Sequence, residues 1–189
     1  NMSTTGPVIS SQNSPPITVL SSSESRVYLA GTYSPRIDYI NHQQASNPST
    51  FILASFVLTD GDADGTPGDS DAAATVLNQL QISLTNSSYI KRIGVYDDTN
   101  TLIAGTEQNG GASLTFSSLG ITAPDDGSKT FTIRASFDFN NVVDEQNIQL
   151  VVTGATAGVG SNFMTGAGLV GGSNLANRTS PATGANMID

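Results

Sequence analysis

Cysteine and tryptophan are absent from the 189-residue sequence, and lysine and arginine together account for only seven residues. Without cysteine, the chain has no disulfide bond, no thiolate metal site and no cysteine nucleophile. No run of 18 apolar residues occurs, so insertion into a membrane is not expected. The net charge of −9 and the scattered positions of the basic residues argue against binding to nucleic acid or to an anionic membrane surface.

The residues that are present favour β structure. Glycine, serine, threonine and asparagine are abundant, while charged residues make up only 12% of the chain. This composition is typical of an all-β extracellular domain, in which threonine and β-branched residues occupy strands and glycine, asparagine and aspartate occupy turns. An exported domain without disulfides needs another source of stability, for instance bound cations. We therefore expect an extracellular protein of the bacterial cell surface.

Alternating apolar and polar residues, together with one continuous apolar run at 51–58, predict strands between residues 51 and 153. The clearest pattern, KTFTIRASFDF at 129–139, predicts one buried face formed by Phe131, Ile133, Ala135, Phe137 and Phe139. The segment TVLNQLQISL at 75–84 also fits one face of a helix at its start, but its alternation continues to Leu84 and favours a strand. Further strands are expected at 51–58, 112–119 and 147–154, with a hairpin over 89–105 that turns at 97–100.

These strands and the turn signals between them predict an all-β fold. The expected architecture is an Ig-like antiparallel β-sandwich of about seven strands, formed by residues 46–154. Residues 1–45 are predicted to be a linker or an extended strand segment that pairs with another subunit. Residues 155–189, rich in glycine, alanine and asparagine, are predicted to be a connector or flap anchored by Phe163 and Met164.

Strand direction also predicts which loops lie together. If successive strands run antiparallel, the aspartate-rich loop after residue 58, the Asp97–Asp98 turn and the APDDGSK loop share one end of the sandwich. The NNVVDEQ loop, with Asp144 and Glu145, falls at the opposite end. We interpret Asp97–Asp98 and Asp125–Asp126–Gly127 as turn formers first and as secondary calcium ligands second. Asp144 and Glu145 are interpreted as a solvated acid pair.

Five aspartates stand close together directly after the apolar segment 51–58, in the stretch LTDGDADGTPGDSDAAAT: Asp60, Asp62, Asp64, Asp69 and Asp71. Counted from the first of them, acids occupy positions 1, 3, 5 and 12 and a glycine occupies position 6. Side chains at positions 1, 3 and 5 converge on one point, the glycine permits a sharp turn, and position 12 completes the shell of oxygen ligands. The five aspartates are therefore the predicted ligands of a Ca²⁺ ion. An acidic, solvated turn is the alternative interpretation.

The loop resembles the calcium loops of EF-hand and dockerin modules, but its surroundings differ from theirs. Position 12 is Asp71 where EF-hands carry glutamate, and Pro67 stands where they carry an apolar residue. A predicted strand precedes the loop where those modules require a helix, and the loop is not repeated. We therefore expect a cation site between strands and not a dockerin.

Several motifs occur in an order that resembles a known repeat domain. They are the TDGDADG loop, the LNQLQISL strand, the GVYDDTNTLIAG hairpin, LTFSSLGITAPDDGSKTFTIRASF and NIQLVV, which together span about 100 residues. The resemblance is to a repeat domain of very long, exported cell-surface proteins of gliding bacteria, some of them adhesin-like. It implies an Ig-like sandwich in a tandem array, exported and made rigid by Ca²⁺.

The leading functional hypothesis is a structural, calcium-stabilised module of an extracellular surface adhesin or filament. Such a module assembles in tandem or with neighbouring copies, and the segment SPPITVLSSS at 14–23 is a candidate strand for addition to a neighbour. The alternative is a calcium-dependent carbohydrate-binding module that takes surface glycans. That alternative is disfavoured because sugars usually stack on exposed aromatic rings, and the chain has no tryptophan and only five tyrosines.

An enzyme is not predicted, and no residue is assigned a catalytic role. The acids are concentrated in turns and are not paired across a cleft as glycosidase chemistry requires. The single histidine, His42, has no nucleophile or acid placed beside it by a motif. The glycine-rich segment after residue 154 lacks the lysine of a phosphate-binding loop.

Overall fold

The computed structural model describes residues 24–29, 36–37, 48, 51–61, 72–143, 146–159, 162–163, 179–180 and 186–188. Within these residues the regular structure consists of β-strands and one short 3₁₀ turn, Ser87–Tyr89. The described part contains no α-helix. The predicted all-β class is confirmed.

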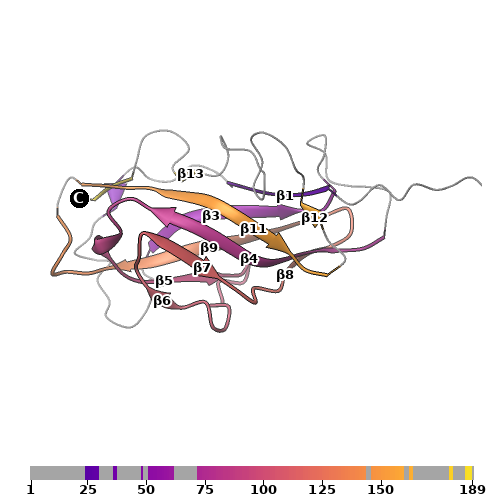
Figure 1. Cartoon of the computed structure of the whole chain (residues 1–189), viewed down its shortest axis with the longest axis horizontal. Helices are drawn as coiled ribbons and strands as arrows, with labels where there is room; N and C mark the ends of the chain where they lie inside the picture. The colour runs from indigo at the N-terminus through magenta and orange to yellow at the C-terminus, as the bar shows by residue number, and fades with distance from the viewer. Residues whose placement is uncertain are drawn as a thin grey trace, which may run out of the picture.

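Two large sheets form the sandwich (Figure 1). The six-stranded sheet has the order β12 (Asn162–Phe163), β1 (Glu24–Leu29), β3 (Phe51–Thr59), β9 (Ser128–Phe137), β5 (Ile90–Tyr96) and β6 (Gln108–Asn109). The second sheet has the order β13 (Thr179–Ser180), β11 (Leu150–Ala157), β4 (Thr75–Leu84) and β7 (Ser113–Phe116), with β8 (Ile121–Ala123) also paired to β4. A small third sheet joins β10 (Asn147–Ile148), β14 (Asn186–Ile188) and β2 (Arg36–Ile37).

The pairing within the two large sheets is antiparallel, except that β1 and β12 are parallel. Successive long strands alternate between the sheets: β3 belongs to the six-stranded sheet, β4 to the other, β5 to the first again. The connections between these strands therefore cross the sandwich at its two ends. In Figure 1, β11, β4 and β7 overlie β3, β9 and β5.

The inner faces of both sheets contribute to a single hydrophobic core. Phe56 of β3 stacks on Phe131 of β9 with ring centroids 5.6 Å apart, and Phe51 stacks on Phe137 at 4.6 Å. The second sheet contributes buried apolar side chains to the same core: Leu77, Leu80, Ile82, Phe116, Leu150 and Val152. Period-two burial of apolar side chains thus explains why these segments form strands.

The segment at 75–84, which also fitted a helix, is a strand throughout. It pairs with β11 on one side and with β7 and β8 on the other, as expected for the centre of a sheet. The predicted hairpin turn is also present, because the N–H of Asn100 donates to the carbonyl of Asp97. The return arm of that hairpin makes only a bridge at Leu102 and the two-residue strand β6, so it is shorter than expected.

The prediction for Phe139 is wrong. Phe131, Ile133, Ala135 and Phe137 are buried as expected, but Phe139 is 64% exposed. Strand β9 ends at Phe137, and the backbone N–H groups of Asn141 and Val142 both donate to the carbonyl of Asp138. The chain therefore turns before the alternation can place Phe139 on the inner face.

The two terminal segments contribute strands to the sheets. From the N-terminal segment, β1 pairs with β3, and β2 pairs with β14. From the C-terminal segment, β12 pairs with β1 and β13 pairs with β11, while β11 itself runs to Ala157 and so crosses the expected boundary at residue 154. The candidate strand at 14–23, His42 and Met164 lie outside the described residues.

The predicted grouping of loops is confirmed for their described residues, whereas residues 62–71, Asp144 and Glu145 lie outside the described part. Strands β3 and β9 are antiparallel with Thr59 opposite Ser128, so the residues after β3 lie beside the APDDG turn before β9. Lys129 forms an ion pair of 2.7 Å with Asp98, which places the hairpin turn at the same end. We call this the Asp60 end, and the end formed by the turn after β9 the Asp138 end. Ten residues of β9 separate them, or roughly 30 Å.

Candidate metal centre

Asp60 follows the last residue of β3 and is fully buried. Its backbone N–H donates to the carbonyl of Gly127 at 2.9 Å, so the antiparallel pairing of β3 with β9 continues one step past Thr59. This bond holds the backbone of Asp60 against the turn that precedes β9. The side chain of Asp60 is thereby positioned between the two sheets at their common end.

Both carboxylate oxygens of Asp60 accept a hydrogen bond. The hydroxyl of Thr75 donates to Oδ1 at 2.5 Å, and the backbone N–H of Asp126 donates to Oδ2 at 3.1 Å. Thr75 is itself buried and opens strand β4 of the second sheet. One carboxylate therefore connects the end of β3, the start of β4 and the turn between β8 and β9.

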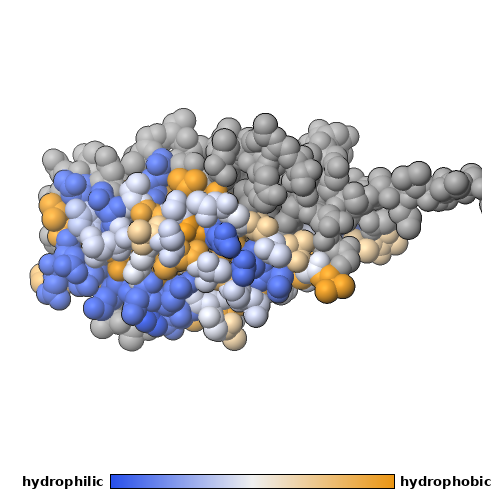
Figure 2. All heavy atoms as spheres, viewed as in Figure 1, coloured by the Kyte–Doolittle hydropathy of each residue, from blue (hydrophilic) through white to orange (hydrophobic). Residues whose placement is uncertain are grey.

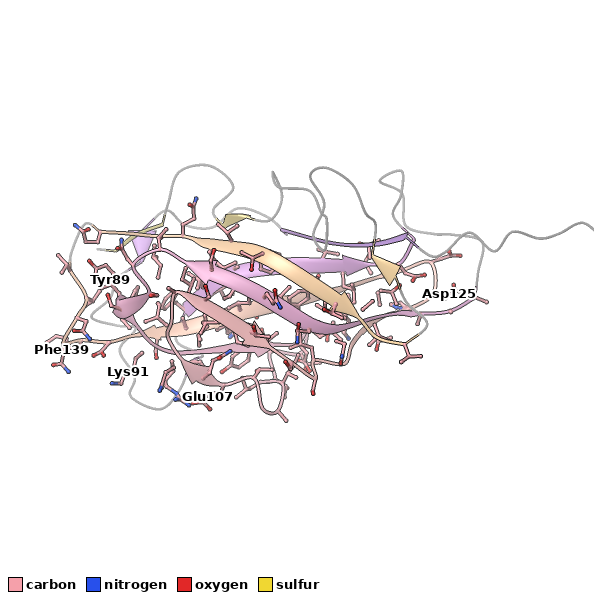
Figure 3. The ribbon with its side chains drawn as sticks, in the orientation of Figure 1. Tyr89, Lys91, Glu107, Asp125 and Phe139 are labelled. Atoms are coloured by element: carbon pink, nitrogen blue, oxygen red, sulfur yellow. The ribbon has the colours of Figure 1, made fainter. Side chains whose placement is uncertain are left out.

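The turn at residues 124–127 presents two more carboxylates. The N–H of Gly127 donates to the carbonyl of Pro124 at 2.9 Å, which closes a β-turn. Asp126 has a φ of 55°, in the left-handed region that aspartate tolerates better than most residues. A Cβ on Gly127 would lie 2.6 Å from Cγ of Pro124, so this close turn requires glycine. Figure 3 shows Asp125 at this end of the molecule.

Asp60, Asp125 and Asp126 form an acidic cluster. One carboxylate oxygen from each lies within 4.8 Å of the others, with Asp60 buried and the other two exposed. Lys129, close to the turn in the sequence, is paired with Asp98 at 2.7 Å. Carboxylate oxygens at this separation repel one another and are the ligands that hard divalent cations prefer. The cluster can hold a metal ion.

The predicted ligands are only partly placed. Asp60 belongs to the cluster, whereas Asp62, Asp64, Asp69 and Asp71 lie outside the described residues. The structure adds Asp125 and Asp126, which the sequence pattern marked first as turn formers. They do form a turn, and strand direction was the signal that placed this turn beside Asp60.

The Asp97–Asp98 turn lies at the same end but forms a separate network. Oδ1 of Asp97 accepts the hydroxyl of Thr99 at 2.7 Å and the backbone N–H groups of Thr99 and Thr101 at 2.9 Å. These bonds, led by that of the Thr99 hydroxyl, lower the pKa of the Asp97 carboxyl. The interpretation of this pair as a turn former is confirmed.

The chain matches no protein-family model and no curated protein sequence. Over the described residues, no helix has the length and apolar character that crossing a membrane would require.

Proposed function

We propose that the chain is a structural module of an extracellular surface adhesin or filament, stabilised by Ca²⁺ and assembled in tandem or with neighbouring copies. The observation that carries the proposal is the position of the acidic cluster. Asp60 follows a strand of one sheet, Thr75 opens a strand of the other, and the turn at 124–127 connects the two sheets again. A cation held there would join both sheets at one end of the sandwich.

Calcium suits this cluster better than other common cations. The donors are carboxylate oxygens, and the described residues of the cluster include neither histidine nor cysteine, which zinc usually takes. Ca²⁺ needs six to eight oxygen ligands. Asp60 also begins the D-x-D-x-D-G pattern, so the aspartates that follow it in the sequence, Asp62, Asp64, Asp69 and Asp71, are proposed to supply further ligands.

A stabilising role follows from the chemistry of the chain. The sequence has no cysteine, so no disulfide constrains the loop of residues 60–74. A bound cation would constrain that loop instead and would remove the repulsion among the aspartates. A stiffened end is the feature that a tandem array of sandwiches needs at its junctions. The order of motifs that resembles the repeats of exported surface proteins supports the same function.

The test is thermal unfolding of the full chain after treatment with EDTA and after Ca²⁺ is restored. At a free Ca²⁺ concentration about 100 times the dissociation constant, binding stabilises the fold by about 2.7 kcal/mol. For a chain of this size that corresponds to a rise in Tm of roughly 5 to 10 °C. Mg²⁺ at the same concentration is the control, because its smaller octahedral shell retains water and suits this loop less well. A Tm that is the same in EDTA and in Ca²⁺ would refute the calcium role.

Assembly is tested on the same protein with Ca²⁺ present. Sedimentation velocity and electron microscopy should show association or filaments that grow with protein concentration. Single particles at every concentration would refute assembly of free copies, and then only tandem linkage within a longer chain would remain.

A further inference from the structure

The Asp138 end carries a shallow, polar depression of about 270 Å³. Three segments line it: the 3₁₀ turn and the start of β5, the strand β6 with the glycine after it, and the turn that follows β9. Its lining consists of Ser87, Ser88, Ile90, Lys91, Asn109, Gly110, Asp138 and Asn141. In Figure 2, hydrophilic side chains gather over β6 and the start of β5 on this side of the molecule. This volume is near the lower limit for ligand pockets, so the depression suits a ligand with a single small ring.

The backbone of these segments is fixed by close contacts. A Cβ on Gly110 would lie 2.2 Å from the carbonyl oxygen of Ile90, so only glycine lets β6 approach β5 so closely here. The N–H of Asp138 donates to the carbonyl of Tyr89 at 2.7 Å, which ties the turn after β9 to the 3₁₀ turn. Side chains on all three segments are thereby held at defined separations around the depression.

The polar groups of the depression retain unused hydrogen-bonding capacity. Asn109 accepts from Arg92 through Oδ1, and Asn141 donates to Asp138 through Nδ2. The amide nitrogen of Asn109 and the amide oxygen of Asn141 make no hydrogen bond to another described residue. Nζ of Lys91 has one ionic contact, with Asp138 at 3.5 Å, so most of its donor capacity is also open.

The charge balance of the depression decides which class of ligand fits. It contains one ammonium group and one carboxylate, and that carboxylate, 16% exposed, already interacts with Lys91, Asn140 and Asn141. An anion would meet Asp138 and a cation would meet Lys91, so neither kind of ion is favoured. A neutral ligand that both donates and accepts hydrogen bonds at several adjacent atoms is favoured.

An aromatic ring lies at the same end. Phe139 follows Asp138 directly and is 64% exposed, and Val143 further along the same loop is 51% exposed. Figure 3 shows Phe139, Lys91 and Tyr89 together at this end, far from Asp125. Polar groups with both donors and acceptors, at the same end as an exposed ring, match the two kinds of surface of a sugar, its hydroxyls and its C–H face.

We propose that this depression binds a neutral saccharide unit through Lys91, Asn109 and Asn141, with Phe139 beside it. The site lies roughly 30 Å from the acidic cluster along β9 and uses none of its aspartates. Binding is therefore independent of Ca²⁺ wherever the protein remains folded, which separates this site from a calcium-dependent sugar site. A single unit in so open a site binds with a dissociation constant on the order of 1 mM.

The experiment is an NMR titration of the ¹⁵N-labelled full chain with the methyl glycosides of glucose, galactose, mannose and N-acetylglucosamine. At least one glycoside should shift the amide signals of 87–91, 109–110 and 138–141 and leave the Asp60 end unchanged. Lys91→Ala should weaken binding roughly tenfold, since it removes a charged hydrogen-bond donor. Lys129→Ala is the matched control, because Lys129 is likewise a half-exposed partner of an aspartate, at the other end.

The titration is repeated in EDTA, below the unfolding temperature of the metal-free protein, and the same shifts are expected. Failure of the calcium role would leave these shifts intact, so the two proposals are judged separately. The saccharide site is refuted if none of the four glycosides shifts these signals, or if the shifts lie elsewhere. It is also refuted if Lys91→Ala binds as tightly as the original chain, or if Lys129→Ala weakens binding equally.

Discussion

Replacing Asp60 with asparagine separates the two roles of this side chain, because the change removes a charge and keeps the shape. Without a metal ion, the carboxylate of Asp60 accepts hydrogen bonds from Thr75 and Asp126 and lies within 4.8 Å of two other acidic oxygens. With a metal ion, it is the buried ligand of the cluster. Asp60→Asn should therefore act differently on the metal-free and the metal-bound protein.

The metal-free effect is small because two contributions oppose each other. At 4.8 Å, repulsion between two carboxylates is about 0.9 kcal/mol in water and about 3.5 kcal/mol at an effective dielectric constant near 20. Since Asp125 and Asp126 are exposed, the lower figure applies to each of the two pairs that Asp60 forms with them, and removing the charge of Asp60 stabilises the fold by roughly 2 kcal/mol. The amide offers one acceptor where the carboxylate offered two, which costs a similar amount. The two contributions nearly cancel.

The metal-bound effect is large. If loss of the buried ligand weakens binding about 100-fold, then at a Ca²⁺ concentration 100 times the original dissociation constant the stabilisation falls from about 2.7 to about 0.4 kcal/mol. Calorimetric or circular-dichroism melts should therefore show Asp60→Asn within about 2 °C of the original chain in EDTA, and roughly 5 to 10 °C below it in Ca²⁺.

The control is Asp98→Asn, an exposed acid at the same end that pairs with Lys129 and lies outside the cluster. This variant should keep the full rise in Tm on addition of Ca²⁺. Equal calcium-induced shifts for Asp60→Asn and the original chain would refute the assignment of Asp60 as a ligand, whatever the variant does to stability in EDTA.

Two further predictions concern the fold. Phe56→Ala removes a fully buried ring that stacks on Phe131, and it should lower the free energy of unfolding by about 3 to 5 kcal/mol in urea titrations; a loss below about 1 kcal/mol would contradict the placement of that ring. The Thr99 hydroxyl lowers the pKa of the folded Asp97 carboxyl below the unfolded value of about 3.9, so its contribution to stability is present above that value and is lost as the pH falls through the folded pKa. Stability measured from pH 6 to pH 2 should therefore fall more for the original chain than for Asp97→Asn, and parallel curves would contradict the pKa shift.

The fold was predictable wherever one periodicity extended through a whole segment. Strands β4 and β9 lie where apolar alternation placed them, because burial on one face imposes a period of two on the sequence, and β3 lies where a continuous apolar run placed it. The error at Phe139 shows the limit of this argument. Alternation indicates which residues can share a face, but the hydrogen bonds that Asp138 accepts decide where the strand ends.

The acidic cluster was predictable only in part, because tertiary structure brings in two of its three residues. Asp60 belongs to a local spacing pattern, which the sequence displays directly. Asp125 and Asp126 are more than 60 residues away, and only the antiparallel pairing of β3 with β9 brings them to Asp60. The polar depression at the other end shares this property, since its side chains come from three separate segments and form no sequence motif.

The two ends of the sandwich meet the same structural requirement in different ways. At the Asp138 end, β4 reaches β5 through a short connection with the 3₁₀ turn, held by backbone hydrogen bonds from Tyr89 to Asn86 and from Asp138 to Tyr89. At the Asp60 end, β3 reaches β4 through residues 60–74, a longer connection with a higher entropic cost of closure. A long connection rich in aspartate also has to offset the mutual repulsion of its carboxylates. Asp60, at the start of this connection, belongs to the acidic cluster that can hold a metal ion, and the proposed Ca²⁺ would constrain the connection in a chain that has no disulfides.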